Sequence, residues 1–226
     1  MKNIIKAAAV AVTMTISADA WSQEFFDVST VTCRRSRGAS SFKATVDIPV
    51  AGPRAVMTEA KKWICNVLDV QTEGNISEAD MPEMISRSCD EFLQNYDATS
   101  RTVRIVWSYE DPTCVTFEAE TTDRDSVRWT TSDVATFSKK DGHRVTAKEI
   151  FACGDNRIKE LMWQFRGNMQ MEVPDSEQLY IGNAGFIDGW IIVIGPARGT
   201  SGAEYRIRYQ VAEPYLRPSQ TGYLAE

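Results

Sequence analysis

The sequence predicts an α+β fold in which an antiparallel sheet packs against helices. Two observations carry this prediction. Some stretches place apolar residues at every second position, as half-buried strands do, and others space them three or four apart, as on one helix face. Their order is strand, two helices, three strands, helix and further strands, which departs from the regular alternation of a parallel α/β sheet.

The first elements are a strand and two helices. Apolar and polar residues alternate over residues 42–50, which predicts the strand. Gly52-Pro53 ends it, and a proline suits the first turn of a helix. Apolar residues then recur at helical spacing over residues 56–68 and again over residues 81–96. We expect these two helices to pack side by side on the sheet.

The rest of the chain is expected to be mainly β. Its predicted strands cover residues 103–109, 115–119, 127–137, 179–181, 186–187, 190–194 and 205–211. Between the third and fourth of these, Thr146 caps a short helical turn and residues 155–165 form a helix. The continuous apolar run at residues 190–194 indicates a strand that is covered on both faces.

Residues 1–20 have the pattern of a cleaved secretory signal. Two lysines precede an apolar run at residues 7–16, and Ala18-Asp19-Ala20 supplies a small-x-small cleavage site. The run is shorter than the roughly 20 apolar residues that cross a bilayer. We therefore expect cleavage between Ala20 and Trp21, no membrane span, and a periplasmic or secreted protein. The alternative is a buried N-terminal helix.

Charge and length narrow the class of protein. Removal of Lys2, Lys6 and Asp19 with the signal takes the formal net charge from −6 to −7. An acidic chain repels nucleic acid, so no nucleic-acid partner is expected, and a basic partner suits it better. We expect three regions, namely the signal peptide at 1–20, a strand and two-helix region at 21–100, and a β-rich domain at 101–226.

The five cysteines are Cys33, Cys65, Cys89, Cys114 and Cys153. Export would place them where disulfides persist. Their spacings are too wide for a zinc knuckle or a C-x-x-C redox motif. Cys65 and Cys89 fall on neighbouring predicted helices and are the favoured pair, followed by Cys114 and Cys153. The odd count leaves one thiol over, and the alternative is that several cysteines are small buried hydrophobic residues.

Catalytic motifs are few. The single histidine, His143, lies in a predicted turn and is expected to be a solvated surface residue. No nucleophile elbow, P-loop or H-E-x-x-H motif occurs, and neither a cofactor nor a metal is expected. Glu118 and Glu120 share one strand face, which leaves a carboxylate-dependent hydrolase as an alternative, although such a pair is also typical of a solvent-facing sheet. Residues 195–202 are expected to be a flexible glycine-rich loop.

The second half, from Trp107 to Leu216, resembles the RsiV-type extracytoplasmic domain of unknown function. That domain is shared by the ectodomain of an anti-sigma factor and by the non-catalytic part of certain peptidoglycan deacetylases. The residues that carry the resemblance are 115–119, 135–146, 148–151, 185–190, 205–209 and 214–216. The chain departs from the family in its residues 195–202 and in having no transmembrane or sigma-binding segment, so an anti-sigma role does not follow.

The resemblance implies an extracellular recognition module, and in one branch of the family the ligand is lysozyme. We therefore expect an exported, non-catalytic binding module, and not an enzyme. Its partner would be a basic protein such as lysozyme or a peptidoglycan fragment. The alternatives are the carboxylate-dependent cell-envelope hydrolase and a structural envelope protein stabilised by disulfides.

Overall fold

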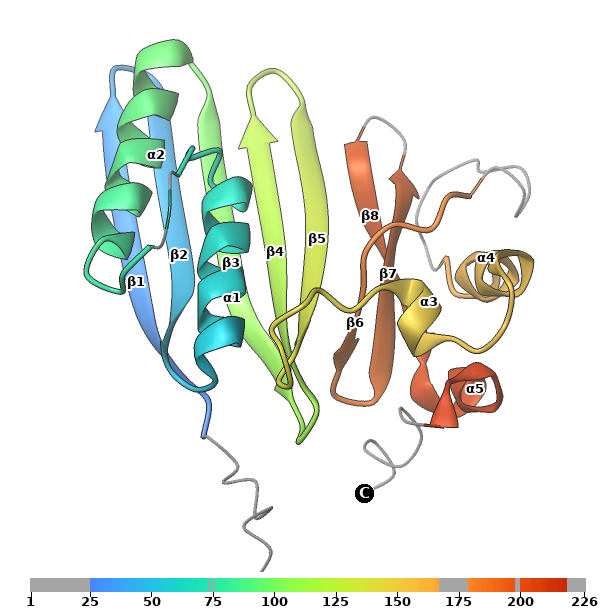
Figure 1. The fold of residues 1–226 in the computed structure, drawn as a ribbon. Coiled ribbons are helices and arrows are strands. Elements are labelled where there is room, and N and C mark those ends of the chain that lie inside the picture. The colour runs from blue at the N-terminus through green and yellow to red at the C-terminus, as the bar shows by residue number, and fades with distance from the viewer. Residues whose placement is uncertain (1–24, 73, 75, 167–178, 198–199, 219–226) are drawn as a thin grey trace, which may run out of the picture.

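Two sheets stand side by side in the computed structural model, which describes residues 25–72, 74, 76–166, 179–197 and 200–218 (Figure 1). The expected signal peptide at residues 1–20 and its cleavage site after Ala20 lie outside the described residues. In the part of the chain that is described, no helix combines the length and apolar character needed to cross a membrane.

The first sheet has five strands in the order β1-β2-β3-β4-β5. They are β1 (Asp27–Arg37), β2 (Ser40–Ala51), β3 (Ser100–Glu110), β4 (Cys114–Arg124) and β5 (Arg128–Ser138). Neighbours are antiparallel except β2 and β3, which are parallel. Parallel strands need a long crossover connection, and the two helices between β2 and β3 supply it.

Helices α1 (Arg54–Val67) and α2 (Met81–Asn95) cover one face of this sheet (Figure 1). Their apolar stripes meet the inward residues of all five strands in one core. Every second residue of β2 from Phe42 to Ile48 is buried there, as the alternation predicts. The prediction of two helices packed side by side on the sheet is confirmed.

The second sheet has three antiparallel strands in the order β6-β7-β8. They are β6 (Ala184–Ile187), β7 (Trp190–Ala197) and β8 (Thr200–Arg208). Three short helices pack around this sheet and share a second core with it. They are α3 (Ala147–Ile150), α4 (Asp155–Gln164) and α5 (Tyr209–Ala212).

The two sheets meet along β5. Val134 packs in a small apolar cluster with Ile187, Ile192 and Ile194 of the second sheet. A Cβ on Gly185 of β6 would lie 2.5 Å from the Thr136 hydroxyl oxygen, so only glycine allows this approach. The continuous apolar run of β7 is buried on both faces, as predicted.

The predicted α+β class is confirmed, and the structure differs from the sequence predictions in five places. The predicted strand at residues 179–181 is absent. The expected loop at residues 195–202 lies largely within β7 and β8, because β7 continues to Ala197 and β8 begins at Thr200. The predicted antiparallel sheet contains one parallel pair, β2 and β3. Strand β1 was missing from the prediction. Residues 209–211 begin helix α5 instead of ending a strand, because Tyr209 and Ala212 are both buried at helical spacing.

The five-stranded sheet also draws strands from both sides of the boundary that the sequence analysis placed after residue 100. Residues 21–100 contribute β1 and β2, and the β-rich region contributes β3 to β5. The two regions therefore share one hydrophobic core.

Candidate functional site

A cleft of about 470 Å³ opens between α1 and the second sheet, on the helix-bearing face of β4 and β5. We call it the central cleft. One wall comes from α1, the floor from β4 and β5, and the opposite wall from β7 and the segment before β6. Its lining includes Trp63, Asn66, Val67, Ala119, Thr121, Thr131, Asp133, Arg144, Tyr180, Gly182, Asn183 and Ile194. The volume lies within the range of small-molecule sites, about 300–1,000 Å³.

Asp133 of β5 organises this cleft. Its carboxylate accepts hydrogen bonds from the Trp63 indole N–H at 2.9 Å and from the Asn183 amide at 2.6 Å. The Arg144 guanidinium lies 3.3 Å away and also donates to the Val134 carbonyl at 2.8 Å. One side chain thus joins α1, β5, the segment before α3 and the segment before β6.

The far wall is attached to β7 by backbone hydrogen bonds. Gly182 N–H donates to the Ile194 carbonyl, and Ile194 N–H donates to the Asn183 carbonyl, both at 2.7 Å. A Cβ on Gly182 would lie 2.7 Å from that Ile194 oxygen, so a larger residue would push the wall away. The Asn183 amide is therefore held against Asp133.

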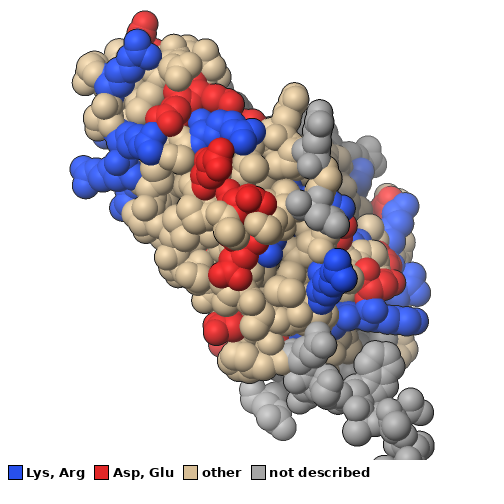
Figure 2. Space-filling view, turned by 60° about the vertical axis from the view of Figure 1, so that its left-hand side comes forward, with Lys and Arg blue, Asp and Glu red and all other residues tan. Residues whose placement is uncertain are grey.

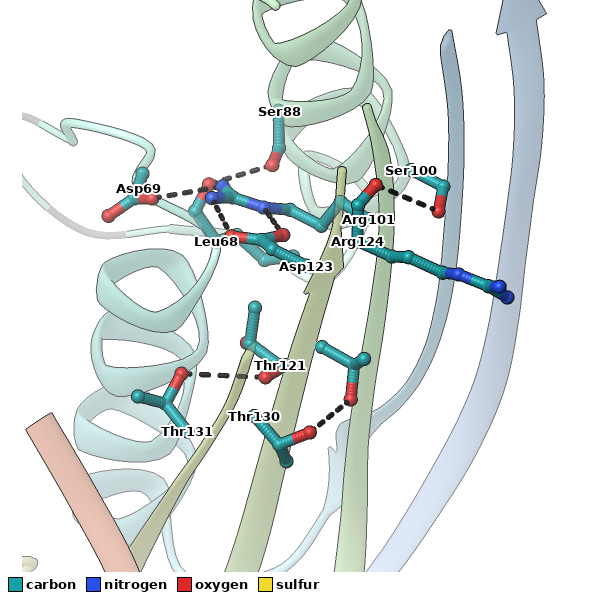
Figure 3. Close-up of polar contacts among 11 residues, drawn as sticks. Leu68, Asp69, Ser88, Ser100, Arg101, Thr121, Asp123, Arg124, Thr130 and Thr131 are labelled. Atoms are coloured by element: carbon teal, nitrogen blue, oxygen red, sulfur yellow. Dashed lines mark hydrogen bonds and ion pairs between the residues drawn. The ribbon is translucent and has the colours of Figure 1, made fainter. Parts of the chain in front are cut away.

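The chemistry of the central cleft is that of a binding site. Thr121 and Thr131 lie side by side beside α1 (Figure 3), and the Thr131 hydroxyl donates to the Thr121 carbonyl at 3.4 Å. Tyr180 is 47% exposed on the opposite wall. Among the described lining residues, Asp133 is the one carboxylate, and its oxygens already accept bonds from three side chains. The lining residues that the structure describes include no cysteine, histidine or second carboxylate that would serve as a nucleophile or base.

Glu118 and Glu120 lie on the opposite face of the sheet. The sequence pattern of this pair is typical of a solvent-facing sheet, and for Glu118 that expectation is wrong. Its side chain is only 18% exposed, and Arg206 of β8 lies 3.5 Å from it. Burial raises the pKa of Glu118, and the neighbouring Glu204 carboxylate adds to the rise. The hollow between these groups measures about 40 Å³, far below a typical ligand site. This pair therefore has no room for a sugar ring.

His143 lies at the surface, as expected for a turn residue. Its Nδ1 is 2.5 Å from Asp141 and its Nε2 is 2.8 Å from Glu149. Glu149 also accepts from the Thr146 backbone and hydroxyl at 2.8 Å, which completes the capping box of α3. His143 therefore fastens the turn after β5 to the first turn of α3. In the described residues, no group of three or more His, Cys, Asp or Glu is arranged to hold a metal.

Figure 2 brings the α2 and β1 side of the molecule forward. Basic side chains lie towards both ends of this face, and acidic side chains form a band across its middle. The ion pair between Arg35 of β1 and Asp90 of α2 joins the two elements. Because charges of both signs adjoin here, their fields offset one another.

A second polar cluster closes the far end of the first sheet (Figure 3). Arg101 of β3 donates to both oxygens of Asp123, its partner on β4, at 2.7 and 2.8 Å. It also lies 3.4 Å from Asp69, and its guanidinium covers the Phe92 ring at 4.8 Å. Arg101 thereby ties the end of α2 and the turn after α1 to the sheet.

All five cysteines are free thiols, so the expected pairs Cys65–Cys89 and Cys114–Cys153 are not bridged. Cys65 and Cys89 are buried in the first core, and Cys114 in the second. Cys65, Cys89 and Cys114 therefore fit the alternative expectation that several cysteines are small buried hydrophobic residues.

Comparison with known proteins identifies the fold. No family model matches the sequence, and no curated protein matches it. Among the solved structures that are similar, two come from the DUF3298 family, a domain of unknown function. The first, from Bacteroides fragilis NCTC 9343, has a TM-score of 0.60 at 10% identity and covers 86% of this chain and 94% of its own. The second, from Pseudomonas aeruginosa PAO1, has a TM-score of 0.53 at 8% identity and covers 88% and 97%. At such identities the likeness concerns the fold alone.

Proposed function

We propose that this protein is an exported binding module whose central cleft holds a polar, uncharged fragment of the cell wall. The observation that carries the proposal is a cleft of about 470 Å³ whose described lining side chains are suited to binding, with none of them placed to react. The DUF3298 fold neighbours are compatible with the RsiV-type resemblance, which implies extracellular recognition.

The lining favours a glycan over an apolar or a charged ligand. Threonine hydroxyls and the Asn66 amide offer both donors and acceptors, as the many hydroxyls of a saccharide require. Tyr180 supplies an exposed ring with an apolar face and a polar end. The Arg144–Asp133 ion pair leaves little net charge in the cleft, so an anionic or cationic ligand would gain little there.

Export and the partner are part of the same proposal. Cleavage after Ala20 would release the chain into the periplasm or the medium, where cell-wall fragments are present. Mass determination of the N-terminus from a periplasmic or culture fraction tests this step. A basic protein such as lysozyme is the other partner that the resemblance suggests, and it would contact an exposed surface instead of filling the cleft.

Calorimetric titration of the purified protein with soluble oligomers of N-acetylglucosamine, the uncharged sugar of the peptidoglycan glycan, tests the ligand. Tyr180→Ala and Thr121→Val should each weaken binding, because loss of one contact of about 1 kcal/mol is roughly fivefold in Kd. Tyr96→Ala is the matched control, since Tyr96 is equally exposed but lies at the end of α2, away from the cleft. If all three variants bind the ligand as tightly as the unaltered protein, the ligand does not bind in the central cleft.

Parallel experiments separate the remaining functions. Saturable binding of lysozyme together with no binding of N-acetylglucosamine oligomers would favour a protein partner over the glycan. Release of products from peptidoglycan that Glu118→Ala and Glu120→Ala abolish would establish the hydrolase instead.

A further inference from the structure

Strand β1 is the outer strand of the five-stranded sheet, and α2 lies over it (Figure 1). Among the described residues it pairs with β2 along one edge and with no strand along the other, and most of its residues are exposed. Cys33 is one of three β1 residues that pack against the first core, to which Cys89 of α2 belongs. An edge strand is held to its sheet by one row of ladder hydrogen bonds, whereas an inner strand has two.

Polar contacts fix the level at which α2 crosses β1. Arg35 donates to Asp90 and, at 2.5 Å, to the Ser86 hydroxyl. Cys33 precedes Arg35 by two residues and so shares its strand face. Cys89 adjoins Asp90 and follows Ser86 by three residues, which places it on the same side of the helix. Both residues therefore lie at the level where Arg35 contacts α2, and their sulfurs are not bonded to each other in the structure.

The two thiols also influence each other directly. Burial raises the pKa of Cys89 to about 12, and the adjacent Cys33 adds to the rise through both charge and a side-chain hydrogen bond. Arg35 acts in the opposite direction, and Asp90 acts in the same direction as Cys33. These are the charged groups that face Cys89 from β1 and α2.

We propose that Cys33 and Cys89 form a disulfide that fastens the edge strand β1 to helix α2. The oxidant is a disulfide, either of a thiol oxidase or of a small molecule. The thiolate of half-exposed Cys33 attacks one sulfur of that disulfide and releases the other as a thiol. Cys89 then gives up its proton and attacks the Cys33 sulfur, which releases the second thiol. Two S–H bonds of the protein become one S–S bond, and the oxidant gains the two electrons and two protons.

The accessibility of the two thiols sets the order of these steps. Cys33 is half-buried and Cys89 is buried, so an external disulfide meets Cys33 first. The high pKa of Cys89 keeps it protonated at neutral pH, which makes the second step slow. The rate of closure should therefore rise as the pH is raised from 7 towards 9.

The experiment incubates the reduced, purified protein with glutathione disulfide and counts the remaining thiols by alkylation and mass spectrometry. We expect a loss of two thiols, a peptide map that joins Cys33 to Cys89, and a Tm on the order of 5 °C higher than in the reduced protein. Cys65→Ala is the matched control, because Cys65 is buried in the same core on the neighbouring helix, and it should still lose two thiols.

Cys33→Ala and Cys89→Ala should each abolish the closure and the redox dependence of Tm. Cys33 lies on the half-exposed strand, so its variant gives a readout even where the core variant fails to fold. Five thiols that persist in the oxidised protein would overturn the proposal, as would a disulfide that both variants retain or one that links two copies of the chain. The assay uses no ligand, so its failure would leave the proposed glycan binding to its own test.

Discussion

The indole nitrogen of Trp63 in α1 donates a 2.9 Å hydrogen bond to the Asp133 carboxylate in β5. The ring is 5% exposed, so its N–H has no easy access to water. The bond therefore connects the helical layer to the strand that also contacts the second sheet. Through Asn183 and Arg144, the same carboxylate reaches both the far wall of the central cleft and the segment that leads to α3.

Replacement of Asp133 by alanine should lower the free energy of unfolding by about 1–3 kcal/mol, because a buried donor on Trp63 loses its acceptor. Trp63→Phe removes the donor and should cost about as much. The double variant should cost less than the sum, with a coupling of about 1 kcal/mol, since both changes delete the same bond. Urea titration of the four proteins measures the coupling, and strict additivity would show that the bond contributes nothing.

Arg101→Lys should destabilise the protein by about 1–2 kcal/mol, even though the charge is kept. Lysine cannot donate to both oxygens of Asp123 in the planar geometry of a guanidinium, and it loses the stacked contact with Phe92. The Arg101 side chain is 17% exposed, so water replaces these contacts poorly.

Arg104→Lys is the matched control, because Arg104 lies on the same strand with its side chain exposed. It should change the free energy of unfolding by less than about 0.5 kcal/mol. Equal effects of the two substitutions in urea titration would mean that the Arg101 contacts are no stronger than surface charge interactions.

The spacing of apolar residues predicted the helices and strands in which buried residues recur at a regular interval. It did not predict elements in which the buried residues follow no regular interval. The helices of the first core follow their apolar stripes closely. Strand β1 was missed because it is an edge strand with mostly exposed, polar residues, so it lacks the alternation that marks a half-buried strand. The parallel pairing of β2 with β3 depends on how a two-helix crossover packs, which no local pattern encodes.

The candidate site was less predictable than the fold. The residues that organise the central cleft lie up to 120 residues apart in the sequence, and none belongs to a motif. They are Trp63, Asp133, Arg144 and Asn183. Only the packing of the second sheet beside β5 brings them together. The sequence offered one signal of this site. Asp133 is a carboxylate in the alternating pattern of β5, at a position that should face the helices. By contrast, the sequence left Glu118 and Glu120 as the carboxylate pair of an alternative hydrolase. In the structure they face a hollow that is too small for a ligand.

Gly185→Ala should be among the most destabilising single-methyl additions, at about 2–3 kcal/mol. The added Cβ would lie 2.5 Å from the Thr136 hydroxyl, 2.7 Å from a Val134 methyl and 2.9 Å from a Thr116 methyl. These atoms belong to β4 and β5, so relief of the overlap requires the two sheets to separate, and overpacking of this kind is costly. Urea titration measures the effect.

Gly154→Ala is the control for Gly185→Ala. A Cβ on Gly154 would meet no atom within 4 Å, and its φ of −74° suits any residue. Its cost should stay at about 1 kcal/mol or less, because the only loss is that alanine is a poorer N-cap residue than glycine. A Gly185→Ala protein as stable as this control would mean that the junction between the sheets is loosely packed.

His143 should make the protein less stable as the pH rises above the ordinary pKa of an imidazole. The hydrogen bond to Asp141 raises the pKa of His143, burial opposes the rise, and the bond to Glu149 adds to it. A raised pKa means that the stabilisation is complete below the unfolded value of about 6.5 and is lost as the pH rises through the folded value. Because the imidazole is 48% exposed, we expect a loss of less than about 1 kcal/mol between pH 6 and pH 8.5.

The variant His143→Gln tests whether this imidazole causes the pH dependence of stability. His143→Gln keeps a polar side chain without the charge, so the difference in urea midpoint between the two proteins should be largest at pH 6 and should vanish by pH 8.5. NMR titration of the His143 ring gives the folded pKa directly, and it should lie above the value measured in urea. A folded pKa at or below that value would mean that Asp141 and Glu149 do not favour the charged ring, and the pH dependence of the midpoint would then have another origin.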